Sequence, residues 1–200
     1  MSNQIGNLKM GQKFKKTPAG EIPVEWESVR IGDLLDYERP DKYIVKSTDY
    51  SKSSGDGVPV LTANKSFVLG YTSEDFGIYR GNPVILFDDF TADSKYVDFP
   101  FKVKSSAIKI LKPKAGVNLK YIFEVMQIIN FTVGDHKRYY ISEYQNVVVP
   151  VPPFSEQEKV SKVLSDIDAL ISGQKKYLDA ISRMKSGLMS ALLTGKVRMG

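Results

Sequence analysis

One stretch of the sequence, residues 149–160 (VPVPPFSEQEKV), separates two kinds of structure. Its prolines cannot continue a strand ladder, and proline also biases the residue before it away from helical geometry. Ser155 and Glu158 then have the spacing of a capping box, in which each side chain bonds a free backbone N–H of the first helical turn. The stretch therefore predicts a domain boundary at residue 153 and a helix that starts at Ser155.

The residues after this boundary carry apolar side chains at helical spacing. Three neighbouring columns of a heptad pattern are mostly apolar, so the stripe is wider than the seam of a two-stranded coiled coil. The stripe continues to Leu193, and Gly195 is a natural C-cap. The pattern predicts one long helix within residues 154–196, roughly 39 residues or about 58 Å in length, followed by a tail at 197–200.

A helix of this length is too long for its own domain to cover. A body of about 130 residues is only about 30 Å across, so about half of the stripe has nothing there to pack against. We expect a coiled-coil-like homodimer, because each large apolar side chain buried gains roughly 1.5–3 kcal/mol before ordering costs. The residues expected in the dimer helix are Val160, Ile167, Leu170, Ile171, Gln174, Leu178, Ile181 and Leu188. Gln174 either fixes the register of the pair or lies at the solvent edge of the stripe.

Residues 21–153 have the pattern of a mixed β-sheet, which predicts an α+β fold. Short runs of β-branched and aromatic residues alternate with turn sequences, at residues 58–61, 66–71, 83–87, 107–111 and 147–151. One helix interrupts them, with Asn118 as its N-cap and apolar residues at helical spacing from Leu119 to Ile129. Residues 1–20 are basic and lack apolar periodicity, which indicates a flexible basic arm or a solvated tail.

The composition argues against several classes of protein. The 200 residues are 42% apolar, enough for one core and an additional element. Without cysteine and with a single histidine, His136, the chain has neither a disulfide framework nor a thiolate or multi-histidine metal site. We find no motif for a nucleotide or a methyl donor, so we expect no cofactor and no catalysis. A membrane span and a signal peptide are also absent from the sequence pattern, which predicts a soluble, cytoplasmic protein.

Four loops combine basic residues with aromatic, amide or hydroxyl side chains, at residues 39–46, 62–65, 88–96 and 136–140. Lysine and arginine contact phosphates, whereas amides, arginine and flat side chains contact base edges. The net charge of +5 agrees with a polyanionic partner but is weak evidence by itself. The residues that we expect to contact DNA are Asn64, Lys65, Thr91, Lys95, His136, Lys137, Arg138 and Tyr139.

Two other interpretations compete with DNA binding. Asp88, Asp89, Asp93 and Asp98 beside Lys95 could hold magnesium in a nuclease. A polar turn explains them better, because the first two aspartates end a strand and only a few residues separate them from the others. The chain could also be a protein-interaction scaffold that uses its long helix as a docking arm.

Several segments resemble the specificity subunits of type I restriction-modification enzymes. Residues 20–23 (GEIP) with Trp26, residues 83–91 (PVILFDDFT), and residues 95–99 (KYVDF) with 104–107 (KSSA) resemble parts of their target-recognition domains. Residues 136–138 (HKR) followed by 141–144 (ISEY) resemble the end of such a domain. The proline junction into Glu156-Gln157, with the later residues 167–168 (ID) and 192–195 (LLTG), resembles the start and end of the long conserved helix of the family.

The resemblance implies a target-recognition domain at residues 21–153 that binds double-stranded DNA, and a conserved helix at 154–196 for pairing and subunit docking. The family's subunit usually carries two of each, so the resemblance implies a half-length subunit, or half of a longer protein, that pairs with itself. It also implies a type I methylation subunit and a type I restriction subunit as partners, with the catalysis in those partners.

Overall fold

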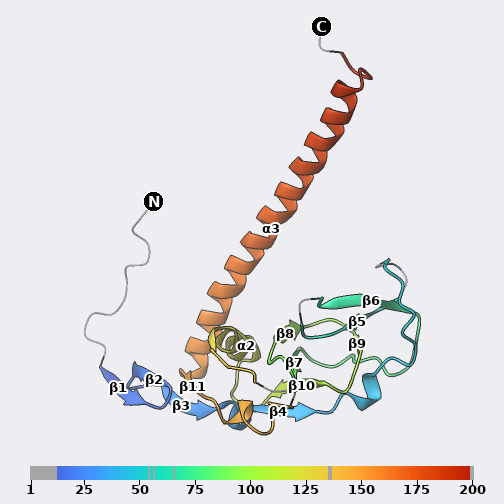
Figure 1. Ribbon diagram of the computed structural model, residues 1–200. Coiled ribbons are helices and arrows are strands. Elements are labelled where there is room, and N and C mark those ends of the chain that lie inside the picture. Colours follow the sequence, from blue (N-terminus) through green and yellow to red (C-terminus); the bar gives the residue numbers. More distant parts are fainter. Residues whose placement is uncertain (1–12, 54, 56, 65, 135–136, 199–200) are drawn as a thin grey trace. The chain divides into compact units, whose positions relative to one another are not determined.

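A computed structural model of the chain describes residues 13–53, 55, 57–64, 66–134 and 137–198 (Figure 1). The contacts within the chain define two compact units, Met1–Glu158 and Lys159–Gly200. Among the described residues, the first unit contains all the strands and the second consists mainly of one helix. This agrees with the predicted α+β body followed by a single long helix.

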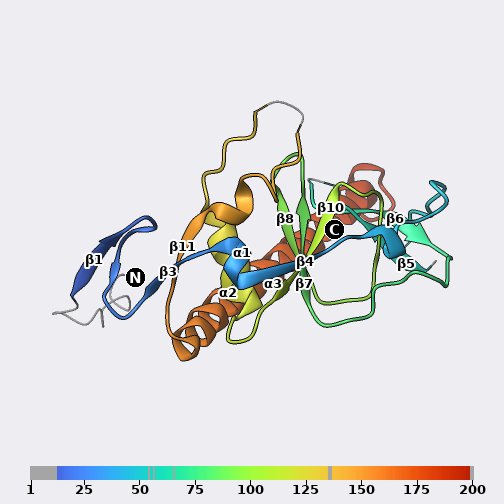
Figure 2. The same ribbon diagram turned by 90° about the horizontal axis from the view of Figure 1, so that it is seen from below.

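The centre of the first unit is a four-stranded antiparallel sheet with the order β4-β10-β7-β8 (Figure 2). Its strands are β4 (Leu35–Glu38), β7 (Val84–Asp88), β8 (Ser94–Val97) and β10 (Ile108–Pro113). All five side chains of β7 are buried. A strand covered on both faces needs a continuous apolar run rather than an alternating one, and the sequence VILF of β7 provides it.

A three-stranded sheet with the order β6-β5-β9 shares this core. It contains β5 (Val58–Leu61), β6 (Val68–Thr72) and β9 (Lys102–Val103); β5 is antiparallel to β6 and parallel to β9. Leu61, Leu86 and Phe101 are fully buried where the two sheets meet. Tyr79 stacks on Phe101 with a ring-centroid distance of 4.9 Å.

Two smaller ladders complete the strands. β3 (Glu27–Arg30) pairs with β11 (Val148–Val151), and β1 (Phe14–Thr17) forms a hairpin with β2 (Gly20–Pro23). The prediction of a flexible arm is therefore wrong for residues 14–20, where the two consecutive lysines Lys15 and Lys16 lie in a short strand. Residues 1–12 of that arm lie outside the described residues. The single-turn elements are α1 (Ile31–Leu34), η1 (Asp41–Tyr43) and η2 (Tyr144–Asn146).

Helix α2 (Leu119–Ile128) contacts β8 and β7. The Asn118 side chain accepts a hydrogen bond of 2.9 Å from the Tyr121 backbone N–H, which confirms Asn118 as the N-cap. Leu119, Ile122 and Met126 are buried along one face of the helix. The predicted helix and the predicted strands at 58–61, 66–71, 83–87, 107–111 and 147–151 are confirmed, with ends that differ by one or two residues.

Helix α3 (Phe154–Leu193) has 40 residues, about 60 Å at 1.5 Å per residue. It begins one residue earlier than predicted, so Ser155 lies inside the first turn and the predicted capping box is wrong. The Pro153 carbonyl instead accepts hydrogen bonds from the Glu156 and Gln157 backbone N–H groups, at 2.8 and 3.1 Å. Gln157 is 2% exposed; its carbonyl accepts from the Asn118 N–H and its amide donates to the Pro152 carbonyl, both at 2.9 Å.

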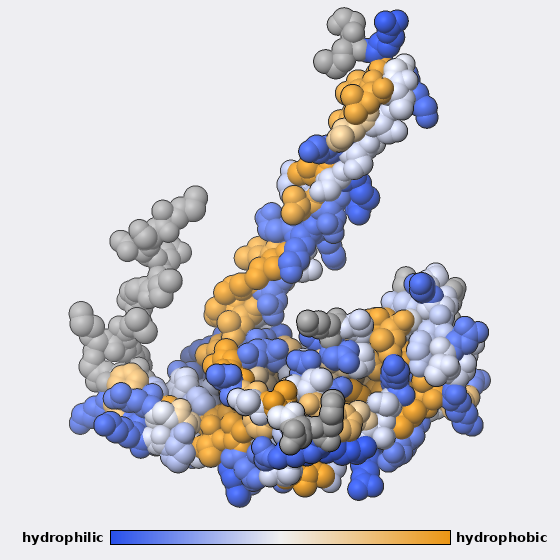
Figure 3. Space-filling view, viewed as in Figure 1, coloured by the Kyte–Doolittle hydropathy of each residue, from blue (hydrophilic) through white to orange (hydrophobic). Residues whose placement is uncertain are grey.

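Apolar side chains are exposed along α3, and Figure 3 shows them as a line along the helix. Within the described part of the chain, no helix combines the length and the apolar character that are needed to cross a bilayer. Gly195, which follows the helix, has a φ of +71°. This left-handed conformation is typical of the residue that ends a helix, as the sequence predicted.

Candidate nucleic-acid interface

Three parallel segments of the first unit end at the same edge. β9 lies between β5 and residues 44–45, because β5 pairs with it in parallel and Ile44 forms a parallel bridge to Val103. The Val45 N–H donates to the Val103 carbonyl and the Lys104 N–H donates to the Leu61 carbonyl, each at 3.1 Å. The segments that end at Val45, Leu61 and Val103 are therefore each followed by a loop at this edge. The predicted loops 39–46 and 62–65 lie together there, beside Lys104.

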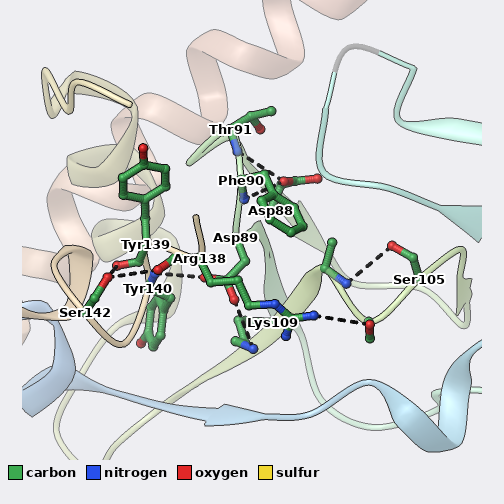
Figure 4. Close-up of polar contacts among 12 residues, drawn as sticks. Asp88, Asp89, Phe90, Thr91, Ser105, Lys109, Arg138, Tyr139, Tyr140 and Ser142 are labelled. Carbon is green, nitrogen blue, oxygen red and sulfur yellow. Dashed lines mark hydrogen bonds and ion pairs between the residues drawn. The ribbon is translucent and has the colours of Figure 1, made fainter. Parts of the chain in front are cut away.

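The loop Lys104–Ala107 connects this edge to the other two predicted loops (Figure 4). The Asp89 N–H donates to the Ala107 carbonyl at 2.9 Å, and the Arg138 guanidinium donates to the Ser106 hydroxyl at 3.5 Å. The same guanidinium lies 5.9 Å from the centroid of the Phe90 ring. We name the exposed cations Lys46, Lys104 and Arg138 the basic edge.

A buried ion pair anchors the loop that carries Arg138. Asp89 and Lys109 are 1% and 4% exposed, and the Asp89 carboxylate lies 3.1 Å from the Lys109 Nζ (Figure 4). Asp89 also accepts two backbone hydrogen bonds, from the Tyr139 N–H to its carbonyl at 2.9 Å and from the Tyr140 N–H to its carboxylate at 2.8 Å. The turn after β7 and the segment 138–140 are therefore held as one unit.

The other aspartates of this region are used by the turn itself. The Asp88 carboxylate accepts the Phe90 and Thr91 N–H groups at 2.9 and 3.2 Å, and the Asp93 carboxylate accepts the Thr91 hydroxyl at 3.1 Å. Among the described residues, no three histidine, aspartate or glutamate side chains are grouped so that they could hold a metal ion. These bonds support the polar-turn interpretation over the nuclease.

The predicted contact residues do not all lie together. Arg138 belongs to the basic edge, Thr91 is exposed in the turn after β7, and Asn64 is half-buried in the turn after β5. Lys137 is exposed and forms an ion pair with Glu143. Lys65 and His136 were also predicted and lie outside the described residues.

Lys95 lies on strand β8, which follows the turn that carries Thr91. It is half-buried on β8 and lines a cavity of about 210 Å³ together with Gln127 and Phe131, which belong to α2 and the segment after it. In the sheet order, β7 lies between β8 and β10, the strand that the loop Lys104–Ala107 enters. Lys95 therefore does not join the basic edge.

The structure corrects the prediction for Tyr139. Its side chain is 1% exposed, it packs edge-to-face on Phe131 at 5.6 Å, and its hydroxyl accepts the Gly134 N–H at 2.6 Å. The prediction that Tyr139 contacts DNA is wrong for this conformation, because the side chain belongs to the interior. Lys137 and Arg138 point outward while Tyr139 and Tyr140 point inward, a division that the sequence HKRYY does not reveal by itself.

Sequence reasoning about individual residues also missed Lys46 and Lys104. Lys104 follows β9, a strand of two residues that has no recognisable alternation. Lys46 was inside a predicted loop but was not selected. The useful signal was that each of these lysines directly follows an apolar residue of a buried strand or segment, since residues at the carboxyl ends of parallel segments share an edge.

Most of the predicted dimer helix is exposed in α3. Leu170, Leu178 and Leu188 are 68%, 63% and 59% exposed. Ile167, Ile171 and Ile181 are also exposed, as is Gln174, whereas Val160 is half-buried. Toward the end of the helix an apolar groove of about 420 Å³ is lined by residues that include Ile181, Met184, Leu188 and Leu192.

Proteins of known family are similar to this chain over most of its length. Residues 23–183 match the family model described as "Type I restriction modification DNA specificity domain". The specificity subunit of the type I restriction enzyme EcoR124I/EcoR124II from Escherichia coli is 43% identical over 152 residues, which cover 73% of this chain and 37% of that protein. A putative type I restriction enzyme MjaX specificity subunit from Methanocaldococcus jannaschii is 28% identical, over 94% of this chain and 47% of that protein.

Solved structures show the same fold. The S subunit of a type I restriction-modification system from M. genitalium matches with a TM-score of 0.63 at 14% identity, over 83% of this chain and 45% of that one. The HsdS subunit from Thermoanaerobacter tengcongensis matches with a TM-score of 0.52 at 16% identity, over 89% of this chain and 47% of that one. The chain thus spans less than half the length of these relatives. On the match of residues 23–183, the chain belongs to the type I restriction modification DNA specificity domain family.

Proposed function

We propose that this chain is the DNA-reading component of a type I restriction-modification complex, and that its first unit binds a half-site through the basic edge. The observation that carries the proposal is that Lys46, Lys104 and Arg138 extend from loops anchored by buried contacts at one edge of the sheets. Cations fix a protein on the DNA backbone, while neighbouring polar side chains contact base edges. Thr91, Ser106 and Asn64 are the polar side chains that accompany these cations.

Two copies of the chain pair through α3. The exposed apolar side chains of this helix include Leu170, Leu178 and Leu188, and their burial against a second helix gains roughly 1.5–3 kcal/mol each before ordering costs. The paired helices hold two reading domains apart, so the target is symmetric with a nonspecific gap. Half-site centres one to two helical turns apart, at about 34 Å per turn, fit a helix of this length.

In this proposal the catalytic activity resides in the partner subunits of the complex. The relatives are named as specificity subunits, which agrees with the prediction of a non-catalytic chain. In this proposal the chain recruits a type I methylation subunit and a type I restriction subunit, which carry out the chemistry on the DNA in the cytoplasm.

Salt-dependent binding to random-sequence duplex tests DNA reading. The logarithm of the affinity should fall linearly with the logarithm of the salt concentration, and Lys104→Ala with Arg138→Ala should reduce that slope by about 1.8, or 0.9 for each lost phosphate contact. Lys162→Ala is the matched control, because this exposed lysine on α3 is paired with Asp166 at 2.7 Å. If the chain binds no duplex either alone or with a methylation subunit, the protein-scaffold function replaces this one.

Sedimentation equilibrium tests pairing. Leu170→Asn with Leu178→Asn should convert a dimer to a monomer, because it places amides in the apolar stripe. Lys175→Ala with Lys176→Ala leaves that stripe intact and should leave the dimer unchanged. A wild-type chain that stays monomeric at high concentration contradicts the pairing.

A further inference from the structure

Lys102 is a fully buried cation in β9, with a side chain that is 0% exposed. Its Nζ lies 2.9 Å from the Glu74 Oε2, donates to the Phe76 carbonyl at 2.6 Å, and lies 4.4 Å from the centroid of the Phe76 ring. Burying a charge is costly unless partners replace its water. Apolar residues of similar volume often stabilise a fold as well as a buried ion pair does, so stability alone does not explain why a lysine is buried here.

The same ion pair is tied to an exposed segment of backbone. The second carboxylate oxygen of Glu74 accepts the N–H groups of Lys46 and Ser47, at 2.9 and 3.0 Å. Burial raises the pKa of Glu74, but the bonds from the Ser47 N–H, the Lys102 ammonium and the Lys46 N–H outweigh it and lower the pKa overall. The carboxylate is therefore ionised when it joins β9 to residues 46–47.

The surroundings leave little freedom at this junction. Gly77 has a φ of +57°, and a Cβ at this position would lie 2.4 Å from the Lys42 carbonyl oxygen and 3.2 Å from the Lys102 Nζ. The neighbouring Phe76 ring has its centroid 4.8 Å from the Lys46 Nζ. The ring of Phe76 thus contacts both the buried ammonium of Lys102 and the exposed ammonium of Lys46.

We propose that Glu74 and Lys102 are positioning residues that hold the Lys46–Ser47 backbone, and with it the Lys46 ammonium, in place for a DNA phosphate. The inference rests on the proposed function of the basic edge and deepens it. A cation whose backbone is already ordered binds with a smaller loss of conformational entropy than one on a free loop. Lys46 is the contact residue, whereas Glu74 and Lys102 act through it.

Amide hydrogen exchange on the full chain, without DNA, tests whether Glu74 holds the Lys46–Ser47 backbone. The variant Glu74→Met/Lys102→Met removes both buried charges together, so that no unpaired charge is left in the interior, and it also removes the oxygen that accepts the Lys46 and Ser47 N–H groups. It should speed exchange at the Lys46 and Ser47 amides at least tenfold and leave the strand amides of β7 and β10 protected. Glu74→Asp keeps the charge but shortens the side chain, so its carboxylate should no longer reach the Lys46 and Ser47 N–H groups. Exchange at these two amides should therefore also become faster. Unchanged exchange at both amides in both variants overturns the inference.

A double-mutant cycle with random-sequence duplex tests the positioning role. Loss of one phosphate contact lowers affinity about tenfold at about 50 mM salt, which is the effect expected for Lys46→Ala in the wild-type chain. In the Glu74→Met/Lys102→Met background the same substitution should cost less than about twofold, because residues that act together are not additive. Lys16→Ala on the separate β1–β2 hairpin is the control, and its effect should be equal in both backgrounds.

The outcomes separate this inference from the proposed function. Faster exchange with a full effect of Lys46→Ala in both backgrounds would overturn the positioning role and leave DNA reading intact. A wild-type chain that binds no duplex, either alone or with a methylation subunit, would overturn the proposed function, and with it the inference, whatever the exchange rates show. Faster exchange together with loss of the Lys46 effect supports both.

Discussion

Replacing Lys109 by methionine would leave the Asp89 carboxylate buried without its cation. Both side chains are almost fully buried, at 1% and 4% exposure, and their charged atoms are 3.1 Å apart. Removing one partner of such a pair costs about 3–5 kcal/mol, because the other charge stays in the interior. For a domain of this size 1 kcal/mol corresponds to about 2–4 °C in Tm, so Lys109→Met should lower the Tm of the first unit by roughly 6–20 °C.

The double variant Asp89→Asn/Lys109→Met should recover most of this loss, because no unpaired charge remains and the asparagine carbonyl can still accept the Tyr140 N–H. Lys112→Met is the matched control in the same strand. Its ion pair with Glu38 is made by a side chain that is 42% exposed, and such a pair contributes about 0–1 kcal/mol.

Trp26 is the single tryptophan of the chain and lies in the first unit, so its fluorescence during thermal unfolding reports on that unit, including Glu156 in the first turn of α3, to which its indole N–H donates. The reasoning would be refuted if Lys109→Met melted no earlier than Lys112→Met, or if the double variant melted as early as Lys109→Met alone.

Three further predictions concern the loops, the acid stability and the helix start. Arg138→Ala should weaken binding to random-sequence duplex and reduce the salt slope by about 0.9, while Arg30→Ala, whose guanidinium is paired with Asp33, should not; equal slopes in the two variants would contradict the role of Arg138. Hydrogen bonds from Lys112, Lys42 and Tyr43 lower the pKa of Glu38 from 4.5 to about 2, so its contribution is complete above pH 4.5 and is lost as the pH falls through 2. Because this site is partly exposed, Glu38→Gln should reduce the free energy of urea unfolding by about 1 kcal/mol near pH 7 and by less near pH 3; a difference independent of pH would argue against it. Asn118→Ala should destabilise the first unit by about 1 kcal/mol through loss of the N-cap, measured by urea unfolding beside Asn130→Ala, which lies outside α2.

The regular elements of the fold were predictable because their signals are local. The run VILF of β7, the cap at Asn118 and the heptad columns of α3 are each contained within one strand or one helix. The start of α3 was placed one residue late because the contacts that fix it involve Gln157, Asn118 and Pro152. The contact between Gln157 and Asn118 joins residues 39 positions apart, and no local pattern reports it.

The candidate site was only partly predictable for the same reason. The sequence indicates that the loops around Thr91 and Arg138 are polar and basic, but the proximity of those loops depends on the pairing of Asp89 with Lys109 and with residues 139–140. Tyr139 was misassigned because an aromatic residue beside two cations is typical of a nucleic-acid contact. The sequence does not show that the Tyr139 ring packs on Phe131 in the interior. Two buried lysines, Lys102 and Lys109, were not anticipated, since lysine is seldom fully buried without a partner.

The central claim is that paired chains present two basic edges to one symmetric DNA target. Selection of duplexes from a random pool, bound by the full chain assembled with its methylation subunit, tests this claim most directly. The account predicts two copies of one short half-site in inverted orientation, separated by a gap of fixed length. A single asymmetric site, or enriched sequences that share no motif, would contradict it.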